Sequence, residues 1–303
     1  MSSDPWWALG AARAVENARH KSEIVATKTL SKHEFDEIVD AQAILRSISG
    51  HALLGGLLEK LDAVANIEAL LIANIDLLRD ETVRFQADSA VGAYLAEITA
   101  TRRRVELLTE KFFPNSVERI MGSFRTLYAS NSEFRLCWEL RNLAQHQGTA
   151  TGRFSFRATG DPERKWEWSI DLRGLFEDHA GDSRWRAAAA LWEGSDWAHV
   201  LDVFDGTHQA ISEVLAVLIH DNEKAISAAI DLYASSLSEA LADGAGYPLA
   251  WSVVPGPEGT AVLGQVGLEP VVLGHAVTAM QGARKILGLA PNLNYPGNRT
   301  EPI

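Results

Sequence analysis

The stretch ELRNLAQHQG, residues 139–148, carries side chains whose types and spacing suit chemistry on a phosphodiester. Arg141 can bind a phosphate through two parallel N–H donors. His146, with a reference pKa near ~6.5, can take up and release a proton around neutral pH. Asn142 adds an amide, and Trp138 adds an aromatic surface on which a base can stack. We therefore take this stretch as the candidate site.

Helical spacing predicts that these side chains lie near one another. Trp138, Asn142 and His146 are four residues apart and would share one face of a helix. Arg141 is one residue off that face, but its long side chain can reach it, and Gln145 lies beside it. His146 would fall in the last turn, where the helix dipole stabilises the protonated imidazole. The alternative is that Arg141 and His146 bind only helix-end carbonyls and a neighbouring carboxylate.

An Arg followed by a His after four to six residues is a weak pattern by itself. The sequence contains four such pairs: Arg13/His20, Arg46/His51, Arg141/His146 and Arg173/His179. Only in the third pair is the Arg followed by Asn, inside a well-marked helix, with Gly148 placed to end that helix. Whether the second or the fourth pair contributes to the site stays open.

The charge distribution points to the same part of the chain. The net charge of −12 argues against general nucleic-acid binding. Residues 102–173, however, hold 13 Lys and Arg against 9 Asp and Glu, a net charge of +4. A phosphate ligand requires such a local basic patch, although chance explains it equally well. Within it, Arg102, Arg103 and Arg104 can grip a nucleic-acid backbone; solvation or pairing with Glu106 is the alternative.

Other features narrow the function further. His199, Asp202, Asp205 and His208 have the residue types of a metal site, but their three-residue steps drift around a helix, so we expect no metal and no cofactor. Cys137 reads as a core residue, and a single cysteine fits a reducing cytoplasm. We expect neither a secretory signal nor a membrane span.

Hydrophobic periodicity predicts a mainly helical chain. Apolar residues recur at three- and four-residue steps over 54–78, 91–112 and 117–127, and Pro114 separates the last two helices. A fourth helix begins at SNSE, where Ser130 and Glu133 have the spacing of a capping box. Short links between these helices predict an antiparallel four-helix bundle.

After the bundle the period changes from helical to alternating. TGRFSFRATG and RKWEWSIDL predict a β-hairpin with the turn GDPE, and Phe154 and Phe156 would face Trp166, Trp168 and Ile170. A long helix from Trp197 to about Ala242, a loop at VVPGPEGT and a helix at 275–287 complete the prediction. The expected segments are an N-terminal helical segment (1–50), the bundle (51–150), the hairpin (151–175) and a helical C-terminal extension (176–303).

The motif RNLAQH, at the end of a fourth bundle helix, resembles that of the HEPN superfamily, named for nucleotide-binding domains of higher eukaryotes and prokaryotes. Its members are antiparallel helical bundles with an Arg-x(4–6)-His motif, often with a polar residue after the Arg. The resemblance covers about residues 51–150. In HEPN toxins controlled by nucleotidyltransferases a Tyr follows the His by two residues; here that position is Gly148, so such control is not implied.

The resemblance implies a metal-independent endoribonuclease, in a toxin–antitoxin or defence setting, that acts as a homodimer with two motifs meeting across the interface. Arg141 would bind the scissile phosphate, and His146 would transfer protons. Asn142 would orient either His146 or the phosphate. RNA contacts would come from Arg102, Arg103, Arg104, Trp138 and Gln145. The alternative is a non-catalytic helical dimer that binds a nucleotide or a protein partner, and a regulatory protein partner also stays open. Metal-dependent hydrolysis by the His199–His208 group is a third reading.

Overall fold

The computed structural model describes residues 5–14, 22–147, 151–158, 166–242, 244, 246–256 and 259–290. The chain is mostly helical and also contains two small antiparallel sheets, which confirms the prediction of a mainly α protein. It divides into two compact units. Unit 1 joins Met1–Ala52 to Ile219–Ile303, and unit 2 is the continuous stretch Leu53–Leu218.

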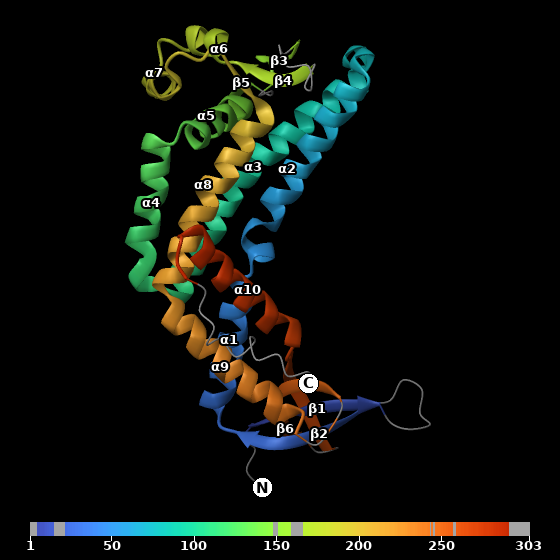
Figure 1. The fold of residues 1–303 in the computed structure, drawn as a ribbon. Helices are drawn as coiled ribbons and strands as arrows, with labels where there is room; N and C mark the ends of the chain where they lie inside the picture. The colour runs from blue at the N-terminus through green and yellow to red at the C-terminus, as the bar shows by residue number, and fades with distance from the viewer. Residues whose placement is uncertain are drawn as a thin grey trace. The chain divides into compact units, whose positions relative to one another are not determined.

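Unit 1 is built on a four-stranded antiparallel sheet in the order β2-β1-β6-β7 (Figure 1). The strands are β1 Trp6–Ala14, β2 Ser22–Leu30, β6 Tyr247–Gly256 and β7 Gly259–Gly267. Ala8 and Leu9 point to opposite faces of β1 and are both fully buried. The strand is therefore covered on both faces, which apolar residues in consecutive positions allow.

Three helices accompany this sheet: α1 Lys32–Ser47, α9 Glu223–Ala240 and α10 Pro270–Ile286. Gln42, buried on α1, donates from Nε2 to the Tyr233 hydroxyl (3.1 Å) and to the Gly267 carbonyl (2.6 Å). One amide thus links α1, α9 and the end of β7. The contacts satisfy polar groups that would be costly to bury alone.

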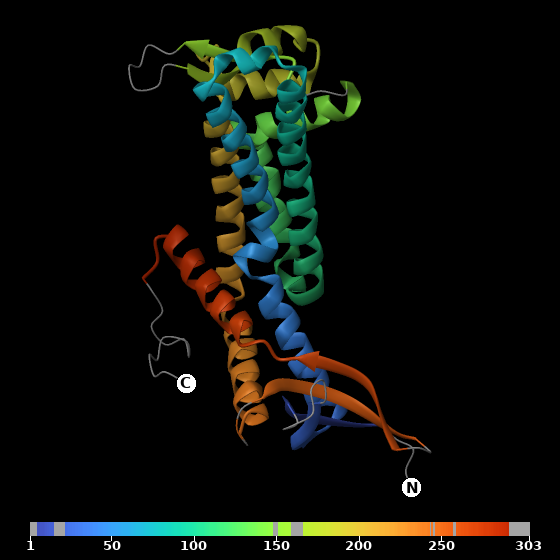
Figure 2. The same ribbon diagram turned by 90° about the vertical axis from the view of Figure 1, so that its right-hand side faces the viewer.

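Unit 2 is a bundle of longer helices. They are α2 Gly50–Ala73, α3 Glu81–Phe112, α4 Val117–Ser130, α5 Ser132–Gln147 and α8 Val200–Asp221. In both ribbon views α2, α3 and α8 run side by side (Figure 1, Figure 2). Tyr94 of α3 stacks on Phe204 of α8 with ring centroids 4.2 Å apart, and its hydroxyl donates to the Phe204 carbonyl at 2.6 Å. Helix α8 therefore shares the core of the predicted bundle.

A three-stranded antiparallel sheet, in the order β3-β4-β5, belongs to the same unit. Its strands are β3 Phe154–Ala158, β4 Trp166–Asp171 and β5 Trp197–His199. Phe156 pairs with Trp168 and Phe154 with Ile170, so the predicted hairpin is confirmed. The predicted turn at 160–163 lies outside the described residues. Two short helices, α6 Leu172–Asp178 and α7 Ser183–Ala189, separate β4 from β5.

The predictions for the two ends of the chain need correction. The segment 1–50 is not helical throughout, because residues 6–14 and 22–30 form β1 and β2. The stretch VVPGPEGT is not a free loop: Val253–Gly256 belongs to β6, and β7 begins at Gly259. Both errors have one cause. The β1–β6 pairing joins residues far apart in sequence, and no local pattern reports it.

Several helix limits also differ from the prediction. The first bundle helix ends at Ala73, and a separate 3-10 helix follows at Ile75–Arg79, capped by the Asn74 side chain. The expected helix from Trp197 to Ala242 begins as strand β5 and is divided at Asn222. Helix α10 begins earlier than expected, at Pro270, a residue favoured in the first turn.

None of the helices described combines the length and the apolar character needed to cross a bilayer.

Candidate functional site

Helix α5 orients the predicted site residues. The side chain of Asn131 caps it, accepting from the backbone N–H of Phe134 at 2.7 Å. Leu136, Cys137 and Leu140 are fully buried, so the opposite sector of the helix is the one left for polar side chains. Along that sector Trp138, Arg141 and Asn142 are partly buried, and Gln145 and His146 are exposed. His146 lies in the last turn, as predicted; Gly148 lies outside the described residues.

Arg141 keeps most of its hydrogen-bonding capacity free. Its Nη1 donates to Asn142 Oδ1 at 3.3 Å. Its Nε is buried and has no hydrogen-bond partner within the described part of the chain. No carboxylate there forms an ion pair with it, whereas many other arginines of unit 2 have such a partner. A guanidinium without a carboxylate partner can bind an anionic ligand without first breaking another ion pair.

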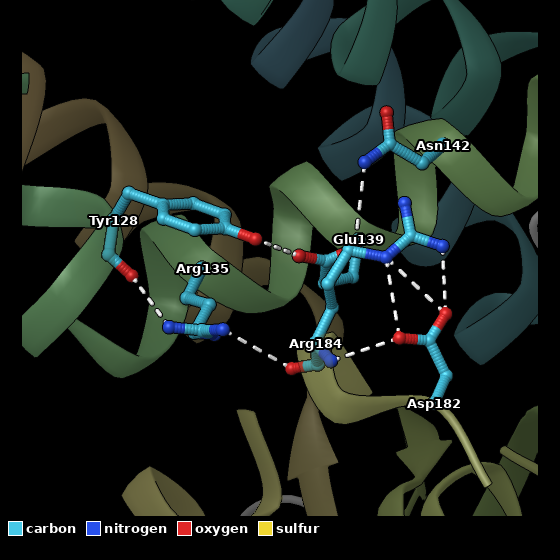
Figure 3. Close-up of polar contacts among 6 residues, drawn as sticks. All are labelled: Tyr128, Arg135, Glu139, Asn142, Asp182 and Arg184. Carbon is cyan, nitrogen blue, oxygen red and sulfur yellow. Dashed lines mark hydrogen bonds and ion pairs between the residues drawn. The ribbon is translucent and has the colours of Figure 1, made fainter. Parts of the chain in front are cut away.

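Asn142 is held by a buried carboxylate (Figure 3). Its Nδ2 donates to Glu139 Oε2 at 3.4 Å, and Glu139 Oε1 accepts from the Tyr128 hydroxyl at 2.5 Å. Glu139 is only 1% exposed. Burial, together with the hydrogen bond to Glu139, raises the pKa of Tyr128 to about 12, so the hydroxyl stays a donor. The contacts run from Tyr128 through Glu139 and Asn142 to Arg141, and they turn the Asn142 oxygen toward the guanidinium.

A second arginine fixes α5 against its neighbours. Arg135, buried on α5, donates from Nη1 to the Tyr128 carbonyl (3.1 Å) and from Nη2 to the Arg184 carbonyl (3.2 Å). Its guanidinium lies 4.4 Å from the centre of the Tyr128 ring. Arg184 in turn bonds both oxygens of Asp182, the cap of α7 (Figure 3). Hydrogen bonds from Arg184 lower the pKa of Asp182 to about 2. The contacts of Arg135 therefore connect α4, α5 and α7.

The three consecutive arginines of α3 point in different directions, because neighbouring helical residues are about 100° apart. Arg102 places its guanidinium 5.4 Å from the centre of the Trp138 ring. Arg103 is paired with Glu106 at 2.6 Å. Arg104 is paired with Glu97 and also donates to Thr101. Only Arg102 thus meets a predicted residue of α5.

The other Arg–His pairs have different surroundings. Arg46 belongs to unit 1 and pairs with Glu269 at 2.9 Å. Arg173 is exposed and pairs with Glu177, and His179 stacks on Trp185 with ring centroids 4.9 Å apart. Arg13 lies on β1, and its partner His20 is outside the described residues. The guanidinium of Arg173 and the imidazole of His179 thus have separate partners, and the side chains of His51 and His20 lie outside the described part of the chain.

The residues considered as a metal site, His199 to His208, also have separate surroundings. His199 is buried, and its Nε2 lies 2.8 Å from Glu68 Oε1, a carboxylate on α2 that also accepts from the Trp168 backbone N–H. His208 is partly buried, and desolvation lowers its pKa. Among the described residues no group of three or more His, Cys, Asp or Glu could hold a metal ion.

The Glu68–His199 pair is a buried polar contact that sequence reasoning missed. The two residues are 131 positions apart in the sequence. Glu68 lies on α2, where hydrophobic periodicity marks the apolar positions but gives no sign of a buried carboxylate. The Nδ1 atom of His199 lies 3.0 Å from Asp202, although this contact is not aligned as a hydrogen bond. Burial lowers the pKa of His199, but the contacts with Glu68 and Asp202 outweigh burial and raise it overall. The two carboxylates therefore favour the protonated form of His199, against the effect of burial.

Comparison with known protein families, with curated proteins and with solved structures finds no match to this chain.

Proposed function

We propose that the protein is a metal-independent endoribonuclease of the HEPN type, in which Arg141 binds the scissile phosphate and His146 transfers protons. The observation that supports this most directly is Arg141 itself. It is a partly buried cation with free donors, held by Asn142 and without a carboxylate partner among the described residues. One residue before the end of the same helix, His146 is exposed to an incoming ligand.

The chemistry needs a base, an acid and a cation. The base removes the proton of a ribose 2′-hydroxyl, whose oxygen attacks the adjacent phosphorus. The P–O5′ bond breaks, and the leaving oxygen takes a proton from the acid. The products are a 2′,3′-cyclic phosphate and a free 5′-hydroxyl. His146 supplies the proton transfer and Arg141 stabilises the charge that develops on the phosphate oxygens.

The spacing of the two residues favours a site shared between two copies. Arg141 and His146 are five positions apart on α5, which separates them by about 140° around the helix axis and about 7.5 Å along it. Side chains that diverge in this way do not readily meet on one phosphate. In a two-fold dimer each motif faces its own copy, so the Arg of one chain can meet the His of the other.

The first test is cleavage of single-stranded RNA in EDTA. We expect wild-type cleavage to persist, and DNA to resist because it lacks the nucleophile. His146→Ala and Arg141→Ala should each lower the rate by on the order of 10²-fold. Lys111→Ala is the control, since this exposed cation near the end of α3 lies against Phe112 and has no role in the proposed site. Full activity in His146→Ala would show that the motif has a structural role and no catalytic one. Loss of cleavage in EDTA would favour metal-dependent hydrolysis by residues 199–208.

A mixing experiment tests the shared site. Arg141→Ala and His146→Ala proteins should each cleave slowly alone but should regain part of the activity when they are mixed and allowed to exchange subunits. A mixed dimer then holds one site with both an Arg and a His. No recovery, with exchange verified by differently tagged chains, would refute a site shared between two copies.

One observation favours the second candidate, a non-catalytic helical dimer that binds a nucleotide or a protein. Catalytic histidines are usually oriented by a hydrogen bond to their second ring nitrogen. Within the described part of the chain His146 has no such partner. RNA binding without cleavage by any wild-type preparation would support this candidate.

A further inference from the structure

A cavity of about 200 Å³ opens beside the predicted site in unit 2. Three helices contribute to it: α3, α4 and α5. Its lining residues are Arg102, Phe124, Arg125, Tyr128, Phe134 and Trp138. Four are aromatic and two are arginines, and we refer to it as the aromatic–arginine cavity.

The aromatic walls are arranged as flat surfaces. Phe134 and Trp138 stack with ring centroids 5.8 Å apart and planes 27° from parallel. Tyr128 meets the Trp138 ring edge-on at 6.4 Å. The guanidinium of Arg102 lies over Trp138, so a planar cation continues the stack. A flat ligand that enters the cavity therefore meets aromatic or guanidinium surfaces.

The two arginines of the cavity are available to an anion. Arg102 has no carboxylate partner among the described residues, and its Nε is buried without a hydrogen bond. Arg125 pairs with Glu118, but their side chains are 63% and 89% exposed. Ion pairs this exposed contribute little to stability, so a phosphate can displace Glu118. The cavity is thus cationic in a chain whose net charge is −12.

We propose that the aromatic–arginine cavity binds one unpaired nucleotide of the RNA, with its base on the aromatic and guanidinium surfaces and its phosphate on Arg102 and Arg125. The inference rests on the proposed function and adds the substrate class: RNA with an unpaired base close to the cleaved bond. A duplex cannot offer such a base, because its bases are stacked and paired. Trp138 and His146 are eight residues apart on one helix, about 12 Å along its axis, so one strand can contact both.

The test measures RNA affinity in a His146→Ala background, which separates binding from cleavage. The readout is the fluorescence anisotropy of a labelled short single-stranded RNA, compared with its duplex and with competition by adenosine monophosphate. Arg102→Ala should weaken binding by about 10-fold or more, because base stacking contributes strongly to single-strand affinity. Arg102→Lys should also weaken it, since an ammonium keeps the charge but has no plane to stack.

Two further variants complete the design. Arg125→Ala should weaken binding and lower the salt dependence by about one phosphate contact. Lys111→Ala, on α3 like Arg102 but outside the cavity, should bind as the background protein does. Circular dichroism verifies that each variant is folded, and Arg102→Lys carries the test if Arg102→Ala does not fold.

The outcomes separate this inference from the proposed function. Weaker binding in the Arg102 variants, with duplex RNA bound poorly, supports the cavity even if the wild-type protein cleaves nothing. Unchanged binding in Arg102→Lys and Arg125→Ala overturns it, even if cleavage is confirmed. Equal affinity for the duplex, or no RNA binding at all, also overturns it. Competition by the mononucleotide as strong as by the single-stranded RNA overturns the assignment to RNA in favour of a free nucleotide.

Discussion

His199 shows how a single residue can make the stability of unit 2 depend on pH. It lies buried between Glu68 and Asp202, and its pKa is raised in the folded state. In the unfolded chain it returns to about 6.5. A raised pKa contributes to the free energy of unfolding fully below the unfolded value. The contribution is lost as the pH rises through the folded-state value.

We therefore predict that wild-type protein loses stability as the pH rises above about 6.5, and that His199→Gln loses less. Glutamine can still donate to Glu68 but cannot be protonated. Urea unfolding at a series of pH values measures this, and the difference between the two proteins should shrink toward high pH. Parallel curves would show that the pKa of His199 is the same in the folded and the unfolded protein.

At the scale of residues, the sequence predicted the neighbours of α5 only in part. Arg102 and Trp138 do meet, because both face outward on adjacent helices. Arg103 and Arg104 do not join them, since a helix turns consecutive residues away from one another. The hydrogen bond between Asn142 and Glu139 could have been predicted from the sequence, because the two residues are three positions apart on one helix. The Tyr128 and Arg184 contacts required the packing of α4 and α7.

At the scale of elements, the start of α5 depends on Asn131 and not on the predicted capping box at Ser130. The Ser130 hydroxyl donates back to the Thr126 carbonyl inside α4. Asn131 instead accepts from the Phe134 N–H, and its own carbonyl accepts from the Arg135 N–H. One residue therefore ends α4 and begins α5.

These two residues form a matched pair for mutation. Asn131→Ala should lower the free energy of unfolding by about 1 kcal/mol, because a buried helix end loses its cap. Ser130→Ala removes an exposed bond within α4 and should change stability by less than about 0.5 kcal/mol. Urea unfolding compares the two variants with wild type. If Ser130→Ala lowers the free energy of unfolding more than Asn131→Ala does, Ser130 is the capping residue, as the sequence predicted.

The helices were easier to predict than the strands for a physical reason. Apolar residues at three- and four-residue steps mark the buried face of α3, and Val91, Leu95 and Ile98 are indeed buried there. Strand β1 has the sequence WWALGAARA, rich in residues of low strand propensity. Strand β6 contains Pro248 and Pro255, which argue against a central strand. Pairing with neighbours on both sides stabilises them as strands: β1 lies between β2 and β6, and β6 lies between β1 and β7.

At the scale of the whole molecule, the two units differ in how the chain builds them. Unit 2 is one continuous stretch, Leu53–Leu218, whereas unit 1 needs both ends of the chain. We predict that a fragment of residues 53–218 folds cooperatively by itself. Its thermal unfolding, followed by circular dichroism, should give a single sigmoidal transition. A fragment that melts gradually or binds a dye for exposed apolar surface would contradict this prediction.

The pairing of β1 with β6 also has a consequence for synthesis on the ribosome. Trp7 pairs with Ser252, so a strand made among the first residues must wait for a partner made among the last. At 5–20 residues per second, the interval from the end of β2 at Leu30 to the start of β6 at Tyr247 lasts on the order of 10–40 s. Unit 2 emerges completely within that interval. The growing chain therefore carries an incomplete sheet with an open edge throughout that interval, and nascent-chain chaperones have that long to cover it.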